Sequence, residues 1–511
     1  MKKRSNKIIS FIKNNWYFVL LVIPFVFFCM ENKEPDNDIW FLMANGKYVL
    51  GHGIPYIDPL SIHEGLNYVM QQWLSAVILY GSYRLFGKFG LLVFLTIIFF
   101  VITFIYYKLC MLVTNKNKKL SFLITILIMT LSKAYIVSRP QIFTYIVLLL
   151  ELMCMEKYIK SKNWKMLIPM PFLSILLINL HASMWLLQFV FMLPVLANCI
   201  YIKGITVDKV QLKPMLITIV LMFLGGFLNP YGWNSMIFVF STYGIPEINV
   251  FISEMQTSNM LMFHWRACVC LALSYIALLF IFKKKTDVRF ILFFCGMFLF
   301  SSMHGKCLIY FILYFGYILG DYLAKIKPIK LNVNPYIKRA FSGLCVGLFF
   351  CLIYTAVFTT IALFKNYDMS TNALGDMVRY VKKNYDVDDI ILFVSFEDGG
   401  YTEFEGIKSY IDPRAELFTK KLNGKEDILK EYVNIGKLES DKDAFIKKYN
   451  FTHLIVSRTD QYLYDYLSKD EDYVLEYTEY FDKEKKEVDM IKLFVRKDIS
   501  ILEGENYEKD N

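Results

Sequence analysis

Long apolar runs, separated by short loops that are alternately rich and poor in Lys and Arg, most constrain what this chain can fold into. A helix needs about 20 apolar residues to cross a bilayer, and helices satisfy their backbone groups within lipid. Such runs recur along the first 365 residues. Apolar residues make up 56% of the 511 residues, too many for a soluble protein of this length. The pattern predicts a polytopic α-helical membrane protein.

We predict about eleven transmembrane helices. They lie at about 16–30, 89–107, 120–132, 141–155, 166–180, 184–202, 214–228, 265–282, 288–303, 307–320 and 340–364. Every loop assigned to the inner side has at least three Lys or Arg residues, whereas the loops 181–183 and 229–264 have none. Because basic loops stay in the cytoplasm, we expect a multi-pass cell-membrane protein with a cytoplasmic N-terminus and an uncleaved signal anchor.

The predicted organisation is a transmembrane domain at 1–365, which includes an outer loop at 31–88, and an extracytoplasmic domain at 366–511. Gln72–Phe86, within the outer loop, has the mixed composition of a helix lying on the membrane. In the second domain, strands are predicted at Ile390–Phe396, Ser409–Ile411, His453–Ser457 and Met490–Val495, and helices at Lys425–Ile435 and Asp441–Tyr449. Strands that alternate with helices indicate a small α/β domain.

Two carboxylates, Asp36 and Asp38, follow the first predicted span. At the outer edge of the membrane, a carboxylate can act as a general base on an acceptor hydroxyl or ligate a divalent cation. Asp38 can also cap a helix at Ile39–Leu50, and one side chain can do both.

The rest of the outer loop carries side chains suited to sugar, since polar groups bind hydroxyls and an indole can cover a sugar face. These candidates are Asp58, His63, Glu64, Gln72 and Trp73. Trp73 equally suits an interfacial anchor.

Cations near the outer ends of spans run against the usual bias toward the cytoplasm. The chain places six there: Lys133, Arg139, His181, Arg266, His304 and Lys306. Converging cations would bind an anionic lipid head group such as a polyprenyl phosphate, since Arg makes forked contacts with phosphate oxygens. Snorkelling to ordinary anionic lipids is the alternative. The net charge of +10 lies mostly in short inner loops and does not predict a nucleic-acid partner.

Two short motifs stand out in the second domain. Gly399-Gly400 follows a predicted strand and permits a close approach of two backbones. Asp412 and Arg414 flank a proline, and we expect them to pair with each other and fix a turn rather than touch substrate.

Taken in order, these motifs resemble the integral-membrane glycosyltransferases of the GT-C fold, and more narrowly an uncharacterised bacterial group of GT-C-like membrane proteins. The pieces that carry the resemblance are Asp36-Asn37-Asp38-Ile39-Trp40, Ile54-Pro55, Asp58-Pro59, Gln72-Trp73-Leu74, Arg139-Pro140-Gln141, Asn179-Leu180-His181, Asn229-Pro230-Tyr231-Gly232, Gly399-Gly400-Tyr401 and Asp412-Pro413-Arg414.

The resemblance implies a lipid-linked donor, typically a polyprenyl-phosphate sugar, used on the outer membrane face. It also implies an Asp of the first outer loop as general base or metal ligand, which is Asp36 or Asp38 here. We favour Asp38, because it directly precedes Ile39-Trp40. Gln71-Gln72 stands where His-Glu is expected, which indicates altered specificity, a substituting Glu64, or an inactive relative.

We therefore predict a membrane glycosyltransferase that moves a sugar from a polyprenyl-phosphate donor to a glycan, lipid or protein acceptor of the cell envelope. No cofactor is required by the sequence, although Asp36 and Asp38 offer ligands for Mg²⁺ or Mn²⁺. The alternatives are a polysaccharide polymerase or ligase acting on lipid-linked glycans, a non-catalytic envelope assembly factor, and a transporter. Transporters usually keep ionisable groups near the bilayer midplane, where the predicted spans have few.

Overall fold

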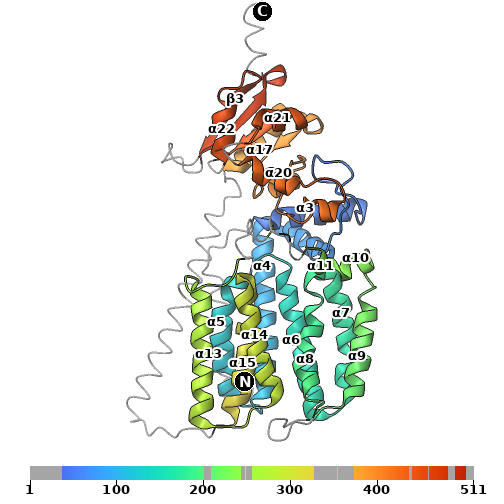
Figure 1. The fold of residues 1–511 in the computed structure, drawn as a ribbon, viewed down its shortest axis with the longest axis vertical. Coiled ribbons are helices and arrows are strands. Elements are labelled where there is room, and N and C mark those ends of the chain that lie inside the picture. Colours follow the sequence, from blue (N-terminus) through green and yellow to red (C-terminus); the bar gives the residue numbers. More distant parts are fainter. Residues whose placement is uncertain are drawn as a thin grey trace, which may run out of the picture. The chain divides into compact units, whose positions relative to one another are not determined.

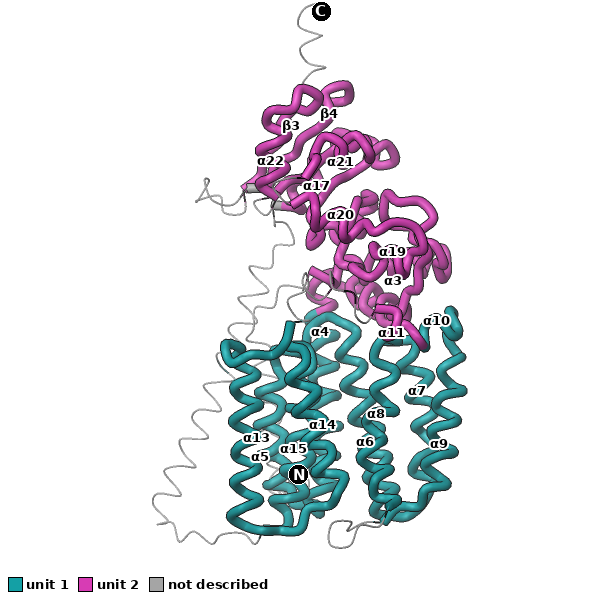
Figure 2. The backbone as a smooth tube through the Cα atoms, viewed as in Figure 1, with its two compact units in different colours: residues 1–34, 92–236, 249–367 teal, residues 35–91, 237–248, 368–511 magenta. Residues whose placement is uncertain are grey.

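The computed structural model describes residues 37–200, 209–242, 245, 248, 256–326, 354, 373–436, 440–457, 460–480 and 490–501. The first predicted span, all of the eleventh except Tyr354, and Asp36 lie outside these residues. The chain divides into two compact units, shown in Figure 2. Unit 1 comprises residues 1–34, 92–236 and 249–367, and unit 2 comprises residues 35–91, 237–248 and 368–511.

This division differs from the predicted domain boundary. The first outer loop was expected to belong with the membrane helices, but residues 35–91 form a unit with 368–511. The physical reason is a set of contacts between the first outer loop and the C-terminal segment, which cannot be predicted from local sequence patterns. Ser61 pairs with Ser409 in an isolated bridge, and Asp58 forms a buried ion pair with Arg414.

Unit 1 consists of helices, which run side by side in Figure 1. They are the later turns of α4 (Trp73–Val113), α5 (Lys118–Ser132), α6 (Gln141–Ser161), α7 (Pro169–Leu180), α8 (Leu187–Ala197), α9 (Leu212–Gly225), α10 (Trp233–Met236), α13 (Phe263–Phe282), α14 (Val288–Met303) and α15 (Leu308–Ala324). Short 3₁₀ turns join them: η1 (Lys133–Tyr135), η2 (Trp164–Leu167), η3 (Ala182–Met184) and η5 (Gly305–Cys307). Helix α15 is buried along nearly its whole length because α5, α13 and α14 pack around it.

Three stretches of the described chain are long and apolar enough to cross a membrane: Trp73–Val113, Phe263–Phe282 and Gly305–Ala324. Four shorter apolar stretches accompany them, at Trp164–Leu180, Ala182–Ala197, Leu212–Gly225 and Val288–Met303. Six of these seven stretches coincide with predicted spans to within about five residues. Trp73–Val113 contains the predicted span at 89–107 together with the separate helix predicted at 72–86. The full number of eleven spans stays a prediction.

Helix α4 is kinked about a third of the way along its length. Its backbone leaves helical geometry at Phe86 (φ −147°, ψ 28°) and Gly87 (φ 61°, ψ −146°). Gly87 takes the left-handed region without the steric cost that a side chain would meet there. The kink separates the predicted helix Gln72–Phe86 from the predicted span that follows it.

Unit 2 contains a small mixed sheet with helices around it. Its elements are α3 (Asp38–His52), the first turns of α4, α11 (Phe238–Thr242), α17 (Ala373–Asn384), η6 (Val387–Asp389), β1 (Leu392–Phe393), α18 (Gly399–Phe404), α19 (Lys420–Asn423), α20 (Ile428–Ile435), α21 (Lys442–Tyr449), β2 (His453–Val456), α22 (Gln461–Leu467), β3 (Tyr473–Tyr480), β4 (Met490–Arg496) and η8 (Lys497–Ile499). The strand order is β1-β2-β4-β3. β1 and β2 are parallel, and the other two pairs are antiparallel.

The core of this sheet is built by α17, which packs on β3 and β4. Met377, Val378 and Val381 lie on one face of α17 and are fully buried against Leu493 and Val495 of β4. The helix is strongly amphipathic, as the spacing of these residues requires.

Candidate functional site

Asp38 is the first residue of α3 and is half-buried. The expected cap of a helix at Ile39–Leu50 is displaced by one residue, because Asn37 occupies the N-cap position and makes no side-chain cap bond. A carboxylate in the first turn is stabilised by the partial positive charge of the helix N-terminus.

Two glycines at the start of α18 permit close backbone approaches, Gly400 to α3 and Gly399 to the segment at Ile411. A Cβ on Gly399 would lie 1.9 Å from the carbonyl oxygen of Ile411, and one on Gly400 would lie 2.9 Å from the backbone nitrogen of Phe41. Trp40 contacts Tyr401 edge-on, with ring centroids 4.9 Å apart. The close approach predicted for the glycine pair is therefore confirmed, and it fixes the turn that carries Asp38.

A buried arginine holds the loop between α3 and α4. The guanidinium of Arg414 is 2% exposed and contacts three carboxylates. Its Nη1 lies 2.5 Å from Oδ1 of Asp58, and its Nη2 lies 2.6 Å from Oδ2 of Asp412 and 3.3 Å from Oε2 of Glu403. The predicted pairing of Asp412 with Arg414 is confirmed, and the backbone N–H of Arg414 also donates to Asp412 at 2.7 Å.

The pKa values of two carboxylates around Arg414, Asp58 and Glu403, shift in opposite directions. Burial raises the pKa of Glu403 well above its usual value, and the negative charge of Asp412 adds to this. Burial would also raise the pKa of Asp58, but the charge of Arg414 and hydrogen bonds from Ser61 outweigh it and lower the pKa. The arrangement thus favours the ionised form of Asp58 and the protonated form of Glu403.

The other sugar-binding candidates of the loop lie along unit 2. His63 Nε2 is 2.8 Å from the carbonyl oxygen of Tyr410, and burial lowers the pKa of its ring. The Glu64 side chain is exposed, and its carbonyl oxygen accepts from Lys425 at 2.7 Å. Gln72 and Trp73 are half-buried where α4 begins. Contact of any of these residues with a sugar stays a prediction.

Gln71, which was noted only as a departure from the family pattern, has a defined partner. Its Nε2 donates to Oε1 of Glu416 at 3.2 Å. Burial raises the pKa of Glu416, which opposes its ionisation. The burial of Glu403 and the half-burial of Glu416 had no local signal, because both depend on segments far away in the chain.

In unit 1, the six predicted cations lie in the loops that follow α5, α7 and α14 and at the start of α13. We call these residues the basic rim: Lys133, Arg139, His181, Arg266, His304 and Lys306. His181 is buried, and its Nδ1 lies 2.8 Å from Oγ1 of Thr144 at the start of α6. Burial and the nearby charge of Lys306 lower the pKa of His181 to about 3, so its ring is neutral at physiological pH.

Further contacts bring the segments of the basic rim together. The ring of Tyr135 in η1 lies 5.1 Å from that of His264 at the start of α13. The backbone N–H of Gly305 donates to Gln256 at 3.1 Å, and that of Ser258 donates to Ser302 at 3.3 Å. Lys133, Arg139, His304 and Lys306 all have interaction partners, and Arg266 is exposed.

Two asparagines support the rim and were not assigned roles from the sequence. Asn179 Nδ2 donates to the carbonyl oxygens of Ile175 and Leu228, each at 2.8 Å, and so ties α7 to the end of α9. Asn229 Nδ2 donates to Gly226 at 2.7 Å and holds the following turn. The sequence marked both asparagines only as members of turn motifs. It did not predict the bond from Asn179 to Leu228, which is 49 residues away.

An apolar cavity of about 840 Å³ lies between α7 and α9. Phe172, Ile175, Leu221 and Leu224 contribute to its wall, and it extends to Leu228, whose carbonyl Asn179 binds. It is a groove suited to a hydrocarbon chain.

The described residues contain no group of three or more His, Cys, Asp or Glu placed to hold a metal ion. Asp38 is a single described carboxylate at the start of α3, so the described residues do not by themselves build the metal site considered for Asp36 and Asp38.

No protein-family model and no curated protein matches the chain by sequence. Solved structures do match. AglB, an archaeal oligosaccharyltransferase from Archaeoglobus fulgidus in complex with an inhibitory peptide and a dolichol-phosphate, is 11% identical, with a TM-score of 0.57 over 87% of this chain and 70% of its own. An Archaeoglobus fulgidus oligosaccharyltransferase in complex with Zn and sulfate has a TM-score of 0.53 at 10% identity, over 86% of this chain and 68% of its own.

A third match is ArnT from Cupriavidus metallidurans, bound to undecaprenyl phosphate. It is 14% identical, with a TM-score of 0.51 over 94% of this chain and 97% of its own. These likenesses confirm the fold class at the level of a GT-C-like, integral-membrane architecture, and the chain has that fold.

Proposed function

We propose that this protein is a membrane glycosyltransferase that moves a sugar from a polyprenyl-phosphate-linked donor to a cell-envelope acceptor on the outer face. The observation that carries the proposal is the likeness, over 94% of the chain, to ArnT bound to undecaprenyl phosphate. The predicted topology belongs to the proposal, with eleven spans, a cytoplasmic N-terminus and an extracytoplasmic segment at 366–511.

The basic rim supplies the donor site in this proposal. As the bond from sugar to phosphate breaks, negative charge grows on the departing lipid phosphate, and fixed cations stabilise that charge most in the transition state. Lys306, Arg139, Lys133 and Arg266 carry the charge. His181 is neutral and serves as a hydrogen-bonding group whose orientation Thr144 sets.

The groove between α7 and α9 suits the polyprenyl chain of the donor. Its wall is almost entirely apolar, and it extends to Leu228. The carbonyl oxygen of Leu228 accepts a hydrogen bond from Asn179, which lies two residues before His181. An isoprenoid tail laid there would keep its phosphate near the rim.

Asp38 is the proposed general base, with assistance from Asp36. Its carboxylate takes the proton of the acceptor hydroxyl, whose oxygen attacks the anomeric carbon as the lipid phosphate leaves with the bonding electrons. The direct displacement inverts the anomeric centre. His63, Glu64, Gln72 and Trp73 are the proposed sugar contacts, and Asp58 takes part by holding the loop through Arg414. No step is assigned to a metal ion.

A second candidate is the transfer of a preassembled glycan rather than a single sugar. The likeness to AglB favours it, because that enzyme is an oligosaccharyltransferase. The lipid-phosphate site and the base keep the same roles, and only the transferred group differs. Analysis of the product distinguishes the two: an acceptor longer by one sugar, or by a whole oligosaccharide.

The test uses purified full-length protein in lipid with a panel of radiolabelled polyprenyl-phosphate sugars and lipid-linked oligosaccharides, with and without EDTA. We expect transfer by the native chain, with at least about a hundredfold loss in Asp38→Asn, in line with the loss of a general base. Asp376→Asn removes a carboxylate outside the proposed site and should retain full transfer. Full transfer by a correctly inserted Asp36→Asn/Asp38→Asn variant would overturn the mechanism, and silence across the panel from folded protein would overturn the proposed function.

A further inference from the structure

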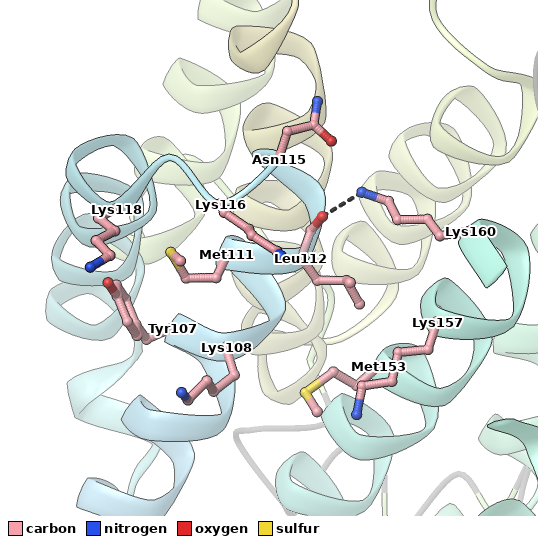
Figure 3. A pocket seen from close by; sticks show the side chains of 10 residues that line it. All are labelled: Tyr107, Lys108, Met111, Leu112, Asn115, Lys116, Lys118, Met153, Lys157 and Lys160. Carbon is pink, nitrogen blue, oxygen red and sulfur yellow. Dashed lines mark hydrogen bonds between the residues drawn. The ribbon is translucent and has the colours of Figure 1, made fainter.

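A second cavity, of about 720 Å³, lies in unit 1 where α4 and α6 end and α5 begins. Five lysines line it: Lys108, Lys116, Lys118, Lys157 and Lys160 (Figure 3). No Asp or Glu is among its lining residues in the described part of the chain. The sequence explains these lysines only as signals that orient the chain, but the structure brings them to one cavity from three helices and the turn between α4 and α5.

This lysine cavity is distant from the basic rim. Helix α6 joins the two regions, with Thr144 near its start and Lys160 near its end. Sixteen residues of helix correspond to roughly 24 Å at 1.5 Å per residue. The cavity is therefore a separate site, and its assignment does not depend on the proposed function.

The position of Lys160 is fixed by a buried network. Its Nζ donates to the carbonyl oxygen of Leu112, as the dashed line in Figure 3 marks, and lies 3.8 Å from Oε1 of Glu156. Glu156 is buried and is held in turn by Arg289 at 3.3 Å and by Tyr317 at 2.8 Å. The wall formed by α6 is thus joined to that of α4.

The turn that carries Lys116 is also well defined. Asn115 and Lys116 have φ values of 52° and 64°, a left-handed conformation that a lysine rarely adopts. The backbone N–H of Lys116 donates to Met111 at 2.9 Å. Within the described residues, the side chains of Lys116 and Lys157 make no hydrogen bond or ion pair. Their charges are therefore available to a ligand.

The lining combines charge with apolar surface. Met111, Leu112 and Met153 lie among the lysines. Ammonium groups act as point charges toward phosphate, and basic pockets between transmembrane helices bind lipid head groups on the cytoplasmic side. A free phosphate would use only the lysines, whereas a phospholipid uses both kinds of surface.

We propose that the lysine cavity binds the phosphate head group of an anionic phospholipid, with the adjoining acyl chain against Met111, Leu112 and Met153. Lys116 and Lys157 supply the recognising charges, and Lys160 joins the two walls. The site would make the membrane helices selective for anionic over zwitterionic lipid.

The test is native mass spectrometry of the full-length protein, titrated with phosphatidylglycerol, with phosphatidylcholine and with inorganic phosphate. The test variant is Lys116→Gln/Lys157→Gln. The control, Lys284→Gln/Lys285→Gln, removes the same charge from exposed lysines elsewhere. Lys116→Arg/Lys157→Arg keeps the charge and should retain binding, which separates lost charge from lost folding.

We expect one tightly retained phosphatidylglycerol in the native chain and in the control, and roughly thirtyfold weaker retention in the test variant, since each lysine contributes about a fivefold factor. Equal retention by test and control variants would overturn the proposal, as would equal retention of phosphatidylcholine. Displacement of the lipid by millimolar inorganic phosphate would assign the cavity to free phosphate and also overturn it.

Discussion

Arg414 Nη1 lies 2.5 Å from Oδ1 of Asp58, although 356 residues separate the two in the chain. Both side chains are fully buried. The pair joins the loop after α3 to the segment after α18.

Arg414→Met is expected to lower the free energy of unfolding of unit 2 by about 3–5 kcal/mol, because it leaves buried carboxylates without their counter-charge. Thermal unfolding of the purified protein in lipid, combined with limited proteolysis of the loop at 53–72, measures the loss. Arg379→Met breaks the surface pair with Asp376, in which the arginine is 55% exposed, and should change stability by less than about 1 kcal/mol. Similar losses in both variants would contradict a special role for the buried pair.

The stability of unit 2 should fall between pH 4 and pH 6 through Asp398. Burial, with the charges of Asp460 and Glu397, raises the pKa of this carboxyl from 3.8 to about 6, although Ser395 donates to it. The folded state therefore binds the proton of Asp398 more tightly than the unfolded state does. The stability that unit 2 gains from this tighter binding is fully present below pH 3.8 and is lost as pH rises through 6.

Asp398→Asn removes this pH-dependent loss of unfolding free energy, which amounts to about 3 kcal/mol for a pKa raised by about two. The gain in unfolding free energy over the native chain should therefore grow from pH 4 to pH 6.5 and then level off. Denaturant unfolding at several pH values measures it, with the exposed Asp465→Asn as control. A gain that does not vary with pH would show that Asp398 keeps its ordinary pKa.

Gly399→Ala is expected to destabilise unit 2 by about 1–3 kcal/mol, as overpacking does, because the new methyl group would meet the carbonyl of Ile411 at 1.9 Å. Relief of that clash would shift α18 against α3, so sugar transfer should fall along with thermal stability. Gly81→Ala adds a methyl group that meets nothing within 4 Å in α4, and it should be neutral or stabilising by up to about 1 kcal/mol. Normal stability in the Gly399 variant would refute the tight contact.

His181 should contribute to donor binding in its neutral form. Since burial and Lys306 lower its pKa to about 3, any stability that it contributes is present above its unfolded pKa of about 6.5 and declines as pH falls below that value. The ratio of transfer rates between His181→Gln and the native chain should be constant from pH 6 to pH 8.5. An inflection of that ratio near pH 6.5 would indicate a titrating, solvent-accessible ring.

Local patterns predicted the local features well. Helix α14 has the predicted bounds 288–303 because an apolar run ends sharply at His304, and α21 begins after Asp441, which accepts from Ala444 as an N-cap. Asp412 and Arg414 pair as expected, since two residues across a proline turn lie within reach of each other.

Features that depend on remote segments escaped prediction. Strand β3 has tyrosines and glutamates on a mostly half-exposed edge of the sheet, so it lacks the apolar signal of a buried strand. Of the predicted strand at 390–396, only Leu392–Phe393 pairs, and Ser409 forms isolated bridges rather than a strand. The partner of Asp58 and the burial of Glu403 follow from tertiary packing, which no local spacing encodes.

The discontinuity of unit 2 has a consequence for biosynthesis. Asp58 leaves the ribosome 356 residues before Arg414, an interval of roughly 20 to 70 seconds at ordinary elongation rates. Until those segments are made, Asp58 lacks its partner Arg414, and α3 lacks Gly400 of α18, which abuts Phe41. Unit 2 therefore cannot complete its fold until residues 368–511 have been synthesised. In a nascent chain halted before residue 414, the loop that carries Asp58 would lack its buried ion pair.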